Sequence, residues 1–546
     1  MDRSVHDWIG RSKKGDMKTA KKEAVKRLLG DIPLTAEIYW LVRRSENPAN
    51  VRYSLKGLKG ILPEAIDAVK AARKNAPPGK KIFLFASVHY WLEDITMMAL
   101  ALSGQGHNVS LGYFPYAKWN INQTKFDIRR QAIYTRDALR PVGNLANFVD
   151  FSGWNASYLV VPDEIQRAVE HVTDYDYMYA FQTEEVDRAN DFYKFRYERN
   201  YRAAQVLFDY LRINRPDSAI VPNGTIMEMG VAYRVLRYLE IPTVTYEFSD
   251  QKKVMWVAQN DEVMLQNTDI LWKQHEDFTL NDSQLKEIQT LMSSRRNGAL
   301  FGNFSRQWQK IPSEGAQKAK TKLGLDERPV VLMATNVLGD SLTLGRQVFS
   351  KSMTDWLIRT IQYFVEVPKV QLVIRIHPGE ALVKHGSIYD KIRETLPVLP
   401  DHIHLVAPTE DINTYDLMEL ARIGLVYTTT VGLEMALHGI PVLVAGKTHY
   451  RNRGFTHDPN TWVDYFKTLN KLISNPQDSM LNEEQIKLAW KYAYLFFYKY
   501  PVPFPWHMVF REKDFKEASM AEVLSKSGLK AYKTTFDLLT FQTRLR

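Results

Sequence analysis

The chain has 546 residues, of which 45% are hydrophobic, 25% charged and 12% aromatic. This is the composition of a folded globular protein, and it excludes a disordered, collagen-like or low-complexity chain. Cysteine is absent, which excludes disulfides, thiolate metal sites and cysteine nucleophiles and favours a reducing compartment, so we expect a cytoplasmic protein.

Charge is distributed unevenly along the chain. Lys and Arg number 72 against 62 Asp and Glu, for a net charge of +10, and residues 1–30 alone hold nine basic and four acidic side chains. The tail from Arg511 adds a further small excess. We expect these ends either to be solvated or to contact an anionic membrane at its cytoplasmic face. Nucleic acid is disfavoured, because no helix-turn-helix, zinc-finger or RNP-like pattern accompanies the charge.

Residues 1–77 are predicted to form a basic helical extension that ends at an Ala-Pro-Pro-Gly turn. The whole sequence contains no apolar run of the ~18–20 residues that a membrane-spanning helix needs, and its first residues contain no apolar stretch typical of a secretory signal. A strand at Lys81–Ala86, a helix at Trp91–Ser103 and a strand at His107–Phe114 follow. Short apolar runs between turn signals are typical of strands buried on both faces, so this order indicates a βαβ unit.

The same order returns at Ser218–Asn223, with a helix to Leu239 and a strand at Pro242–Glu247. We therefore predict a first Rossmann-like domain over residues 78–328. Residues 115–200, rich in Tyr, Asp and Arg, are predicted to be irregular insertions in it.

A clearer alternation begins at Pro329. Because parallel neighbouring strands need a crossover of a dozen or so residues, strands separated by helices indicate a doubly wound parallel sheet. We predict a second Rossmann-like domain over 329–480, followed by a helix and a basic tail over 481–546. The fold class is thus α/β, with two tandem Rossmann-like domains and helical extensions at both ends. The predicted elements are strands at Val330–Thr335, Val370–Ile376, His404–Ala407, Gly424–Tyr427 and Pro441–Ala445, and helices at Thr354–Phe364, Ile412–Arg422, Val431–His438 and Asn482–Tyr498.

Polar residues follow several strands of the second domain, at the edge where open α/β sheets bind ligands. Thr428, Thr429 and Thr430 open a helix, whose first amides would attract an anion such as phosphate. Glu434 lies one turn further on, where a carboxylate can accept hydrogen bonds from a ribose diol. The alternative is a strand end with an ordinary N-cap.

Arg375, His377 and Pro378 end another strand at this edge, and Asn336 follows the first one. The imidazole of His377 could donate a hydrogen bond to a phosphate. The alternative is that His377 has only a structural role. The loop after the last strand adds Lys447, Tyr450, Arg451 and Arg453. Its cations would stabilise the charge on a leaving phosphate or diphosphate, or they are ordinary surface charges.

Other nucleotide and metal motifs are missing. There is no Gly-x-Gly-x-x-Gly, and the tempting Gly446-Lys447-Thr448 lacks the first glycine of a P-loop, because Pro441 stands in its place. No His-Glu-x-x-His pattern or Gly-x-Ser-x-Gly elbow is present. We expect no cofactor and no metal.

The segments Val373–Glu380 (VIRIHPGE) and Val426–Pro459 resemble the bacterial capsule polysaccharide biosynthesis family, which includes β-Kdo transferases, and the paired domains resemble the GT-B architecture. The resemblance implies metal-independent transfer of a sugar from a CMP- or UDP-activated donor to a surface or capsular polysaccharide or a lipid-linked glycan. It also implies that His377 and Thr428–Thr430 contact the donor phosphate and nucleotide, with Glu434 near the ribose.

A general base is expected from the first domain, where the loop after the first strand offers His89, Glu93 and Asp94, with Glu228 and Glu247 as rivals. Three other functions remain open on this fold, since Rossmann-like pairs host many reactions. They are a CDP-glycerol-type polyol-phosphate transferase, a nucleotide-sugar epimerase, and a non-catalytic subunit of a glycan-assembly complex.

Overall fold

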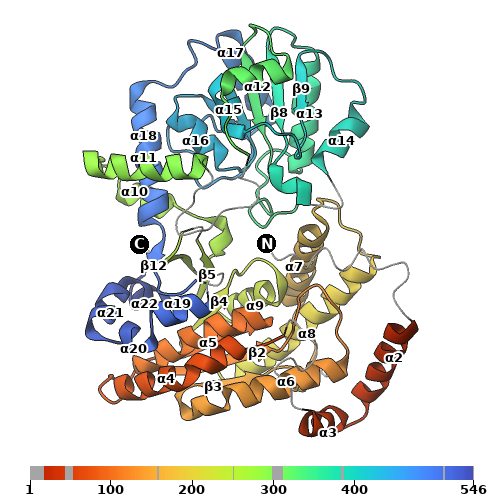
Figure 1. Ribbon diagram of the computed structural model, residues 1–546, viewed down its shortest axis with the longest axis vertical. Helices are drawn as coiled ribbons and strands as arrows, with labels where there is room; N and C mark the ends of the chain where they lie inside the picture. The colour runs from red at the N-terminus through yellow and green to blue at the C-terminus, as the bar shows by residue number, and fades with distance from the viewer. Residues whose placement is uncertain are drawn as a thin grey trace. The chain divides into compact units, whose positions relative to one another are not determined.

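The computed structural model describes residues 17–43, 53–156, 159–249, 251–297, 311–382, 387–507 and 511–544. The chain divides into two compact units (Figure 1). The first holds residues 1–176, 187–264 and 502–546, and the second holds 177–186 and 265–501. None of the described helices combines the length and apolar character needed to cross a membrane.

The first unit is built on a seven-stranded sheet of order β12-β6-β5-β4-β1-β2-β3. Strands β5, β4, β1, β2 and β3 are parallel neighbours, whereas β6 and β12 extend the sheet antiparallel. The predicted βαβ unit is therefore confirmed as the middle of a larger sheet. The strands are β1 (Lys81–Ser87), β2 (Asn108–Phe114), β3 (Asn147–Asp150), β4 (Ser218–Pro222), β5 (Thr243–Phe248), β6 (Val254–Gln259) and β12 (Val502–Pro503).

Helices surround this sheet. From Trp91 onward, every residue of α5 is buried, so this helix lies in the core of the unit. The predicted helices at 91–103 and 225–239 are confirmed as α5 and α9. The helices are α2 (Met17–Asp31), α3 (Thr35–Val42), α4 (Lys56–Arg73), α5 (His89–Gly104), α6 (Lys125–Leu139), α7 (Asp163–Phe181), α8 (Asp191–Ile213), α9 (Met227–Tyr238), α19 (Arg511–Glu517), α20 (Met520–Val523), α21 (Lys526–Ala531) and α22 (Lys533–Leu539).

The prediction that residues 115–200 are irregular is wrong. They form α6, β3, all of α7 and the start of α8. The reason is visible in α8, where Arg196, Asn200 and Asp209 are buried among apolar residues. Polar side chains thus occupy the core face of the helix, and the apolar period that would predict a helix is interrupted.

The second unit is built on a five-stranded parallel sheet of order β11-β10-β7-β8-β9. Successive residues of β7 point to opposite faces, because Val331 and Met333 belong to one apolar cluster and Leu332 and Ala334 to the other. The predicted doubly wound α/β fold is confirmed. The strands are β7 (Val330–Ala334), β8 (Gln371–Arg375), β9 (Ile403–Val406), β10 (Ala421–Val426) and β11 (Val442–Val444).

The unit boundaries differ from the predicted domains. Residues 265–328 were predicted to belong to the first domain, but they lie in the second unit, because α11 packs on α18 and α12 on α15. Residues 502–546 return to the first unit, where β12 pairs with β6 and α20 packs on α4. The second unit's helices are α10 (Asp269–Gln274), α11 (Asp282–Arg296), α12 (Ala316–Leu323), α13 (Met353–Val365), α14 (Ile388–Thr395), α15 (Thr414–Leu420), α16 (Val431–Leu437), α17 (Trp462–Ser474) and α18 (Glu483–Tyr494).

Candidate functional site

A pocket of about 120 Å³, here called the β8–β10 pocket, lies at the carboxyl ends of the strands in the second unit. The register explains its position, since Ala334 pairs with Arg375 on one side and with Val426 on the other, so that the three strands end in a row. The residues after these ends share one edge of the sheet. Six residues predicted from the sequence line the pocket, namely Arg375, His377, Pro378, Thr429, Thr430 and Glu434.

His377 is held at the pocket by its own backbone and ring. Its amide donates to the Thr335 hydroxyl at 3.0 Å, and its Nδ1 accepts from the Gly379 amide at 3.0 Å. An Nδ1 that accepts leaves the proton of the neutral imidazole on Nε2, which is then a donor. Gly379 is needed for this approach, because a Cβ there would lie 2.8 Å from Nδ1.

Arg375 is the buried cation of the pocket. Its Nη1 donates to the Ala407 carbonyl at 2.8 Å and its Nε to the Thr414 hydroxyl at 3.4 Å. Its Nη2 is buried and has no hydrogen-bond partner among the described residues. Burial lowers the pKa of Arg375 to about 10, so the guanidinium is charged at neutral pH. Since a buried charge without a full set of partners is costly, this group is suited to an anionic ligand.

The threonine run forms a turn that is braced from two sides. The Tyr450 hydroxyl donates to the Thr429 carbonyl at 2.7 Å, and the Thr428 amide donates to Asn336 Oδ1 at 3.1 Å. The first amides of α16 donate within this turn. The Val431 amide donates to the Thr429 hydroxyl, and the Gly432 amide donates to the Thr429 carbonyl. The amides of Val431 and Gly432, which were predicted to face an anion, are thus already used within the turn, and Thr429 and Thr430 line the pocket at this point.

Glu434 lies in the pocket lining together with a residue that the sequence did not single out. Its Oε1 accepts from Arg295 Nε at 3.2 Å, and its buried Oε2 has no hydrogen-bond partner among the described residues. Arg295 and Arg296 end α11 and also line the pocket. The signal that could have found them is a pair of arginines in the last turn of a helix. Residues 282–296, however, were assigned to the first domain and not to the domain that contains the pocket.

The loop after β11 does not supply the predicted cations to this pocket. Lys447 is exposed. Arg451 is buried and donates to the carbonyls of Val444 and Pro459. Arg453 pairs with Asp269. None of the three lines the β8–β10 pocket, and the contacts of the two arginines hold the loop in place.

The general-base candidates lie at strand ends of the first unit. His89 begins α5, is half-buried, and has Nδ1 3.2 Å from the Ala117 carbonyl. Glu93 and Asp94 are buried one turn further along α5. Glu247 Oε2 accepts from Asn223, and burial raises the pKa of Glu247.

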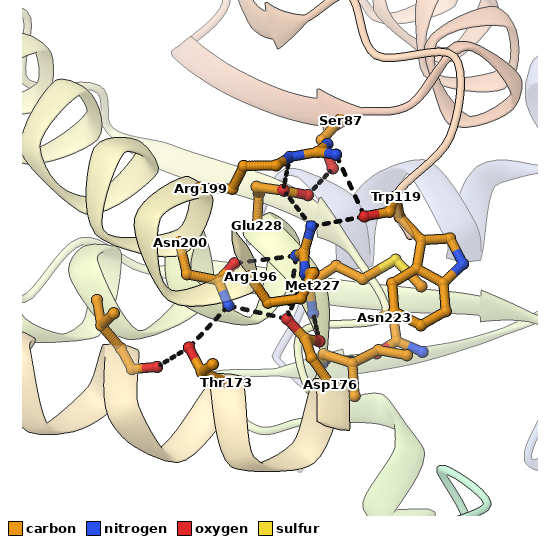
Figure 2. A network of polar contacts seen from close by, with 12 residues as sticks. Ser87, Trp119, Thr173, Asp176, Arg196, Arg199, Asn200, Asn223, Met227 and Glu228 are labelled. Carbon is orange, nitrogen blue, oxygen red and sulfur yellow. Dashed lines mark hydrogen bonds and ion pairs between the residues drawn. The ribbon is translucent and has the colours of Figure 1, made fainter. Parts of the chain in front are cut away.

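Glu228 belongs to a buried ionic network rather than to an open site. Figure 2 shows its carboxylate between Arg196 and Arg199, with distances of 2.9 and 3.0 Å, and Ser87 donates to it at 2.8 Å. Asp176 lies on the other side of Arg196, at 3.0 Å. Burial alone would raise the pKa of Glu228, but the two guanidinium groups outweigh it and lower the pKa to about 2. A carboxylate this acidic is a poor proton acceptor at neutral pH.

The first unit contains a pocket of about 710 Å³, here called the α6–α8 pocket. Phe114, the last residue of β2, and Tyr116 just after it line this pocket together with Phe195 of α8, and Arg199 and Arg202 add basic groups. The Arg199 guanidinium lies 3.5 Å from the centre of the Tyr116 ring. Arg199 is already paired with Glu228, but the lining as a whole has an excess of basic groups, with Lys125, Arg129, Arg136, Arg199 and Arg202 against Glu37, Asp150 and Glu198.

Residues 299–489 match the sequence model of a family described as "Capsule polysaccharide biosynthesis protein". The match covers about a third of the chain and includes β7 to β11 with the β8–β10 pocket. It confirms the family resemblance that the motifs predicted for this part of the chain. A comparison with curated protein sequences finds no match.

Several solved structures are similar at low identity. Two come from Thermosulfurimonas dismutans KpsC: its beta Kdo 2,7 transferase (13% identity, 52% of this chain and 79% of that chain, TM-score 0.30) and its beta Kdo 2,4 transferase (14%, 50% and 78%, TM-score 0.33). A third is the UDP-GlcNAc 2-epimerase from Neisseria meningitidis bound to UDP-GlcNAc (12%, 77% and 100%, TM-score 0.24). Likeness at this level does not establish a shared activity.

Proposed function

We propose that this chain, in which residues 299–489 belong to the capsule polysaccharide biosynthesis family, is a glycosyltransferase. It would move a sugar from a CMP- or UDP-activated donor to a capsular or surface polysaccharide or a lipid-linked glycan. The observation that carries the proposal is the buried Nη2 of Arg375, which has no partner among the described residues and belongs to a pocket at the ligand edge of the sheet.

The pocket chemistry suits the departure of a nucleotide. When the bond between the anomeric carbon and the donor phosphate breaks, negative charge grows on the leaving phosphate. Arg375, the Nε2–H of His377 and the hydroxyl of Thr430 would donate to that charge, and such donors stabilise a transition state more than a ground state. Glu434 Oε2 would accept a hydrogen bond from a ribose hydroxyl. At about 120 Å³ the pocket is smaller than the ~300–1,000 Å³ of typical ligand sites, so it would hold this linkage and not the whole donor.

The acceptor would bind in the first unit. The α6–α8 pocket supports this, because its aromatic rings and arginines suit an anionic sugar chain. Among the predicted bases, His89 remains the best candidate. If Nδ1 donates to the Ala117 carbonyl, the lone pair of the neutral ring is on Nε2, which can take the proton of an acceptor hydroxyl.

Thermal unfolding with a panel of nucleotides tests the proposal. A ligand at 100 times its dissociation constant stabilises the folded state by ~2.7 kcal/mol. We expect CMP, CDP, UMP or UDP to raise Tm in the wild type, and His377→Ala to remove that shift while the apo protein unfolds at an unchanged temperature. Stabilisation by CDP-glycerol alone would instead favour polyol-phosphate transfer, and conversion of UDP-GlcNAc to its 2-epimer would favour an epimerase. No shift with any nucleotide would favour a non-catalytic subunit.

A second test addresses the ribose. If Glu434 accepts from the ribose hydroxyls, the wild type should prefer CMP over dCMP, or UMP over dUMP, by about tenfold or more, the value of one hydrogen bond to a charged group. Glu434→Gln should reduce this preference and leave the affinity for the deoxynucleotide nearly unchanged. An equal loss for both nucleotides would mean that Glu434 is structural.

A further inference from the structure

Helices α2 and α3, red in Figure 1, contact α6 through both charged and aromatic side chains. Lys26 pairs with Asp127 at 2.9 Å, Asp31 pairs with Lys125 at 2.7 Å, and Glu37 pairs with Arg129. The helices approach closely, because a Cβ on Gly30 would lie 2.8 Å from the Phe126 amide nitrogen. The side that faces the protein is thus attached by ion pairs and by the buried ring of Trp40, which packs on Tyr134 of α6.

The opposite side of the two helices, here called the outer face, is apolar. Of the fourteen large apolar side chains that are exposed in the described part of the chain, eight lie between residues 25 and 42. Most of them are about half exposed or more, up to 78% for Val42. Tyr39, the least exposed of the eight, contacts Phe126 and Arg130 of α6 with its ring. The outer face consists of the other seven, namely Val25, Leu28, Ile32, Leu34, Ile38, Leu41 and Val42.

These side chains form a stripe on each helix and not a random scatter. Val25 and Leu28 on α2, with Ile32 just after it, are spaced by three and four residues, and Ile38, Leu41 and Val42 on α3 are spaced in the same way. Side chains at this spacing share one face of a helix. An apolar patch of this kind on an otherwise ordinary surface marks a place where the protein meets a partner or a membrane.

Exposed cations accompany the outer face. Lys21, Lys22, Arg27 and Arg43 are exposed and form no ion pair with any described residue. The described acids of the two helices are engaged, Glu23 by Lys26 and Asp31 and Glu37 by α6. The charge that remains available around the apolar stripe is therefore positive. Two copies of this surface would repel each other, while a negatively charged surface would be attracted.

We propose that the outer face of α2 and α3 docks on an anionic lipid bilayer. The apolar side chains enter the boundary between head groups and acyl chains, and the four cations contact lipid phosphates, the arrangement by which amphipathic helices lie on a membrane without crossing it. The ion pairs with α6 keep the two helices attached to the unit while their apolar side is in lipid. The proposal does not depend on the proposed function.

The α6-facing side of the helix pair borders the α6–α8 pocket, because Gly30 and Glu37 of the helix pair and Lys125 and Arg129 of α6 line it. One helix thickness, about 10 Å, therefore separates this pocket from the outer face. Docking would bring the pocket to about this distance from the head groups. If the proposed glycosyltransferase activity holds, this favours a lipid-linked acceptor over a polymer that is free in solution.

Vesicle flotation of the full-length chain tests the proposal. We expect the wild type to float with vesicles of phosphatidylcholine and 30 mol % phosphatidylglycerol and to bind pure phosphatidylcholine at least tenfold more weakly. Leu28→Glu combined with Leu41→Glu should lower partitioning to the anionic vesicles at least tenfold. Replacing Lys21, Lys22 and Arg27 by Gln should lower partitioning to the anionic vesicles by about fivefold per removed charge at low salt.

The matched control is Val398→Glu combined with Val463→Glu, which introduces the same charges at exposed valines of the second unit and should float like the wild type. All these side chains are exposed, so the variants should keep the wild-type Tm and nucleotide response. Equal flotation of Leu28→Glu/Leu41→Glu and wild type would overturn the proposal. The proposal would also be overturned if the wild type were a dimer that does not bind vesicles and Leu28→Glu/Leu41→Glu were a monomer. The outer face would then be a self-association surface.

Discussion

The hydroxyl of Tyr450 donates a 2.7 Å hydrogen bond to the carbonyl of Thr429, which joins the loop after β11 to the threonine turn of the β8–β10 pocket. Tyr450 is fully buried, and a Cβ on Gly432 would lie 2.4 Å from its hydroxyl. The side chain was predicted to bind the donor directly. The structure instead gives it a supporting position behind the residues that line the pocket.

Tyr450→Phe should therefore weaken nucleotide binding by about three- to tenfold, the effect of one lost hydrogen bond on a neighbouring turn. The turn would keep its fold but lose its fixed position. Isothermal titration with the nucleotide that stabilises the wild type measures this. Tyr233→Phe removes a similar bond, to the Asn260 carbonyl in the first unit, and should leave the affinity unchanged. If both variants bind like the wild type, Tyr450 contributes only packing.

Arg375→Met should abolish nucleotide binding without destabilising the protein. Burial lowers the pKa of Arg375 by about 2.5 pH units, from 12.5 to about 10, which corresponds to a cost of about 3 kcal/mol for keeping it charged. Replacement by Met removes the cost of the buried charge. It also leaves the Ala407 carbonyl without its donor, which lowers the free energy of unfolding by about 1–3 kcal/mol. We expect urea unfolding within about 1 kcal/mol of wild type and at least a hundredfold weaker binding. A variant that is strongly destabilised yet still binds nucleotide would mean that Arg375 is structural.

The sequence predicts the five strands of the second sheet and four strands of the first, β1, β2, β4 and β5, because these are short apolar runs between turn signals. It does not predict β3, β6 and β12. It predicts the edge at which His377 and Thr429 meet, since parallel strands end together. It fails where a helix buries polar groups, as α8 buries Arg196 and Asn200. It also cannot tell which arginines of a loop or helix end reach a pocket, because that depends on packing between segments far apart in the chain. Arg295 lines the pocket for this reason, whereas Arg451 holds its own loop.

Glu228→Gln should destabilise the first unit by about 3–5 kcal/mol, because it leaves Arg196 and Arg199 with one uncompensated charge in the interior. Urea unfolding measures the loss. Glu262→Gln breaks a partly exposed pair with Arg234 and should cost about 1 kcal/mol or less. Nucleotide affinity of the folded protein should stay at the wild-type value in both variants. If Glu228→Gln is as stable as the wild type but transfers no sugar, Glu228 is the catalytic base and not part of a structural network.

Glu380 gives the protein a pH-dependent stability that can be tested separately. The carboxylate is buried, Oε2 accepts from the Ile388 amide at 3.1 Å, and Oε1 has no hydrogen-bond partner among the described residues. Burial raises the pKa of Glu380 from 4.5 to about 7. Between these two values the folded protein binds more protons than the unfolded chain, so this group's contribution to the free energy of unfolding falls as pH rises from about 4.5 to 7. At ~1.36 kcal/mol per pH unit the fall is about 3 kcal/mol.

Glu380→Gln keeps an acceptor for the Ile388 amide and carries no titrating group. Relative to the wild type it should therefore gain about 3 kcal/mol of stability between pH 4.5 and pH 8, with little difference at the acidic end, where the wild-type carboxyl is already protonated. Urea unfolding at both pH values measures this. Glu484→Gln, at an exposed position on α18, controls for the loss of a surface charge and should follow the wild type at both. Parallel pH profiles for Glu380→Gln and the wild type would show that this carboxyl ionises as readily in the folded protein as in the unfolded chain.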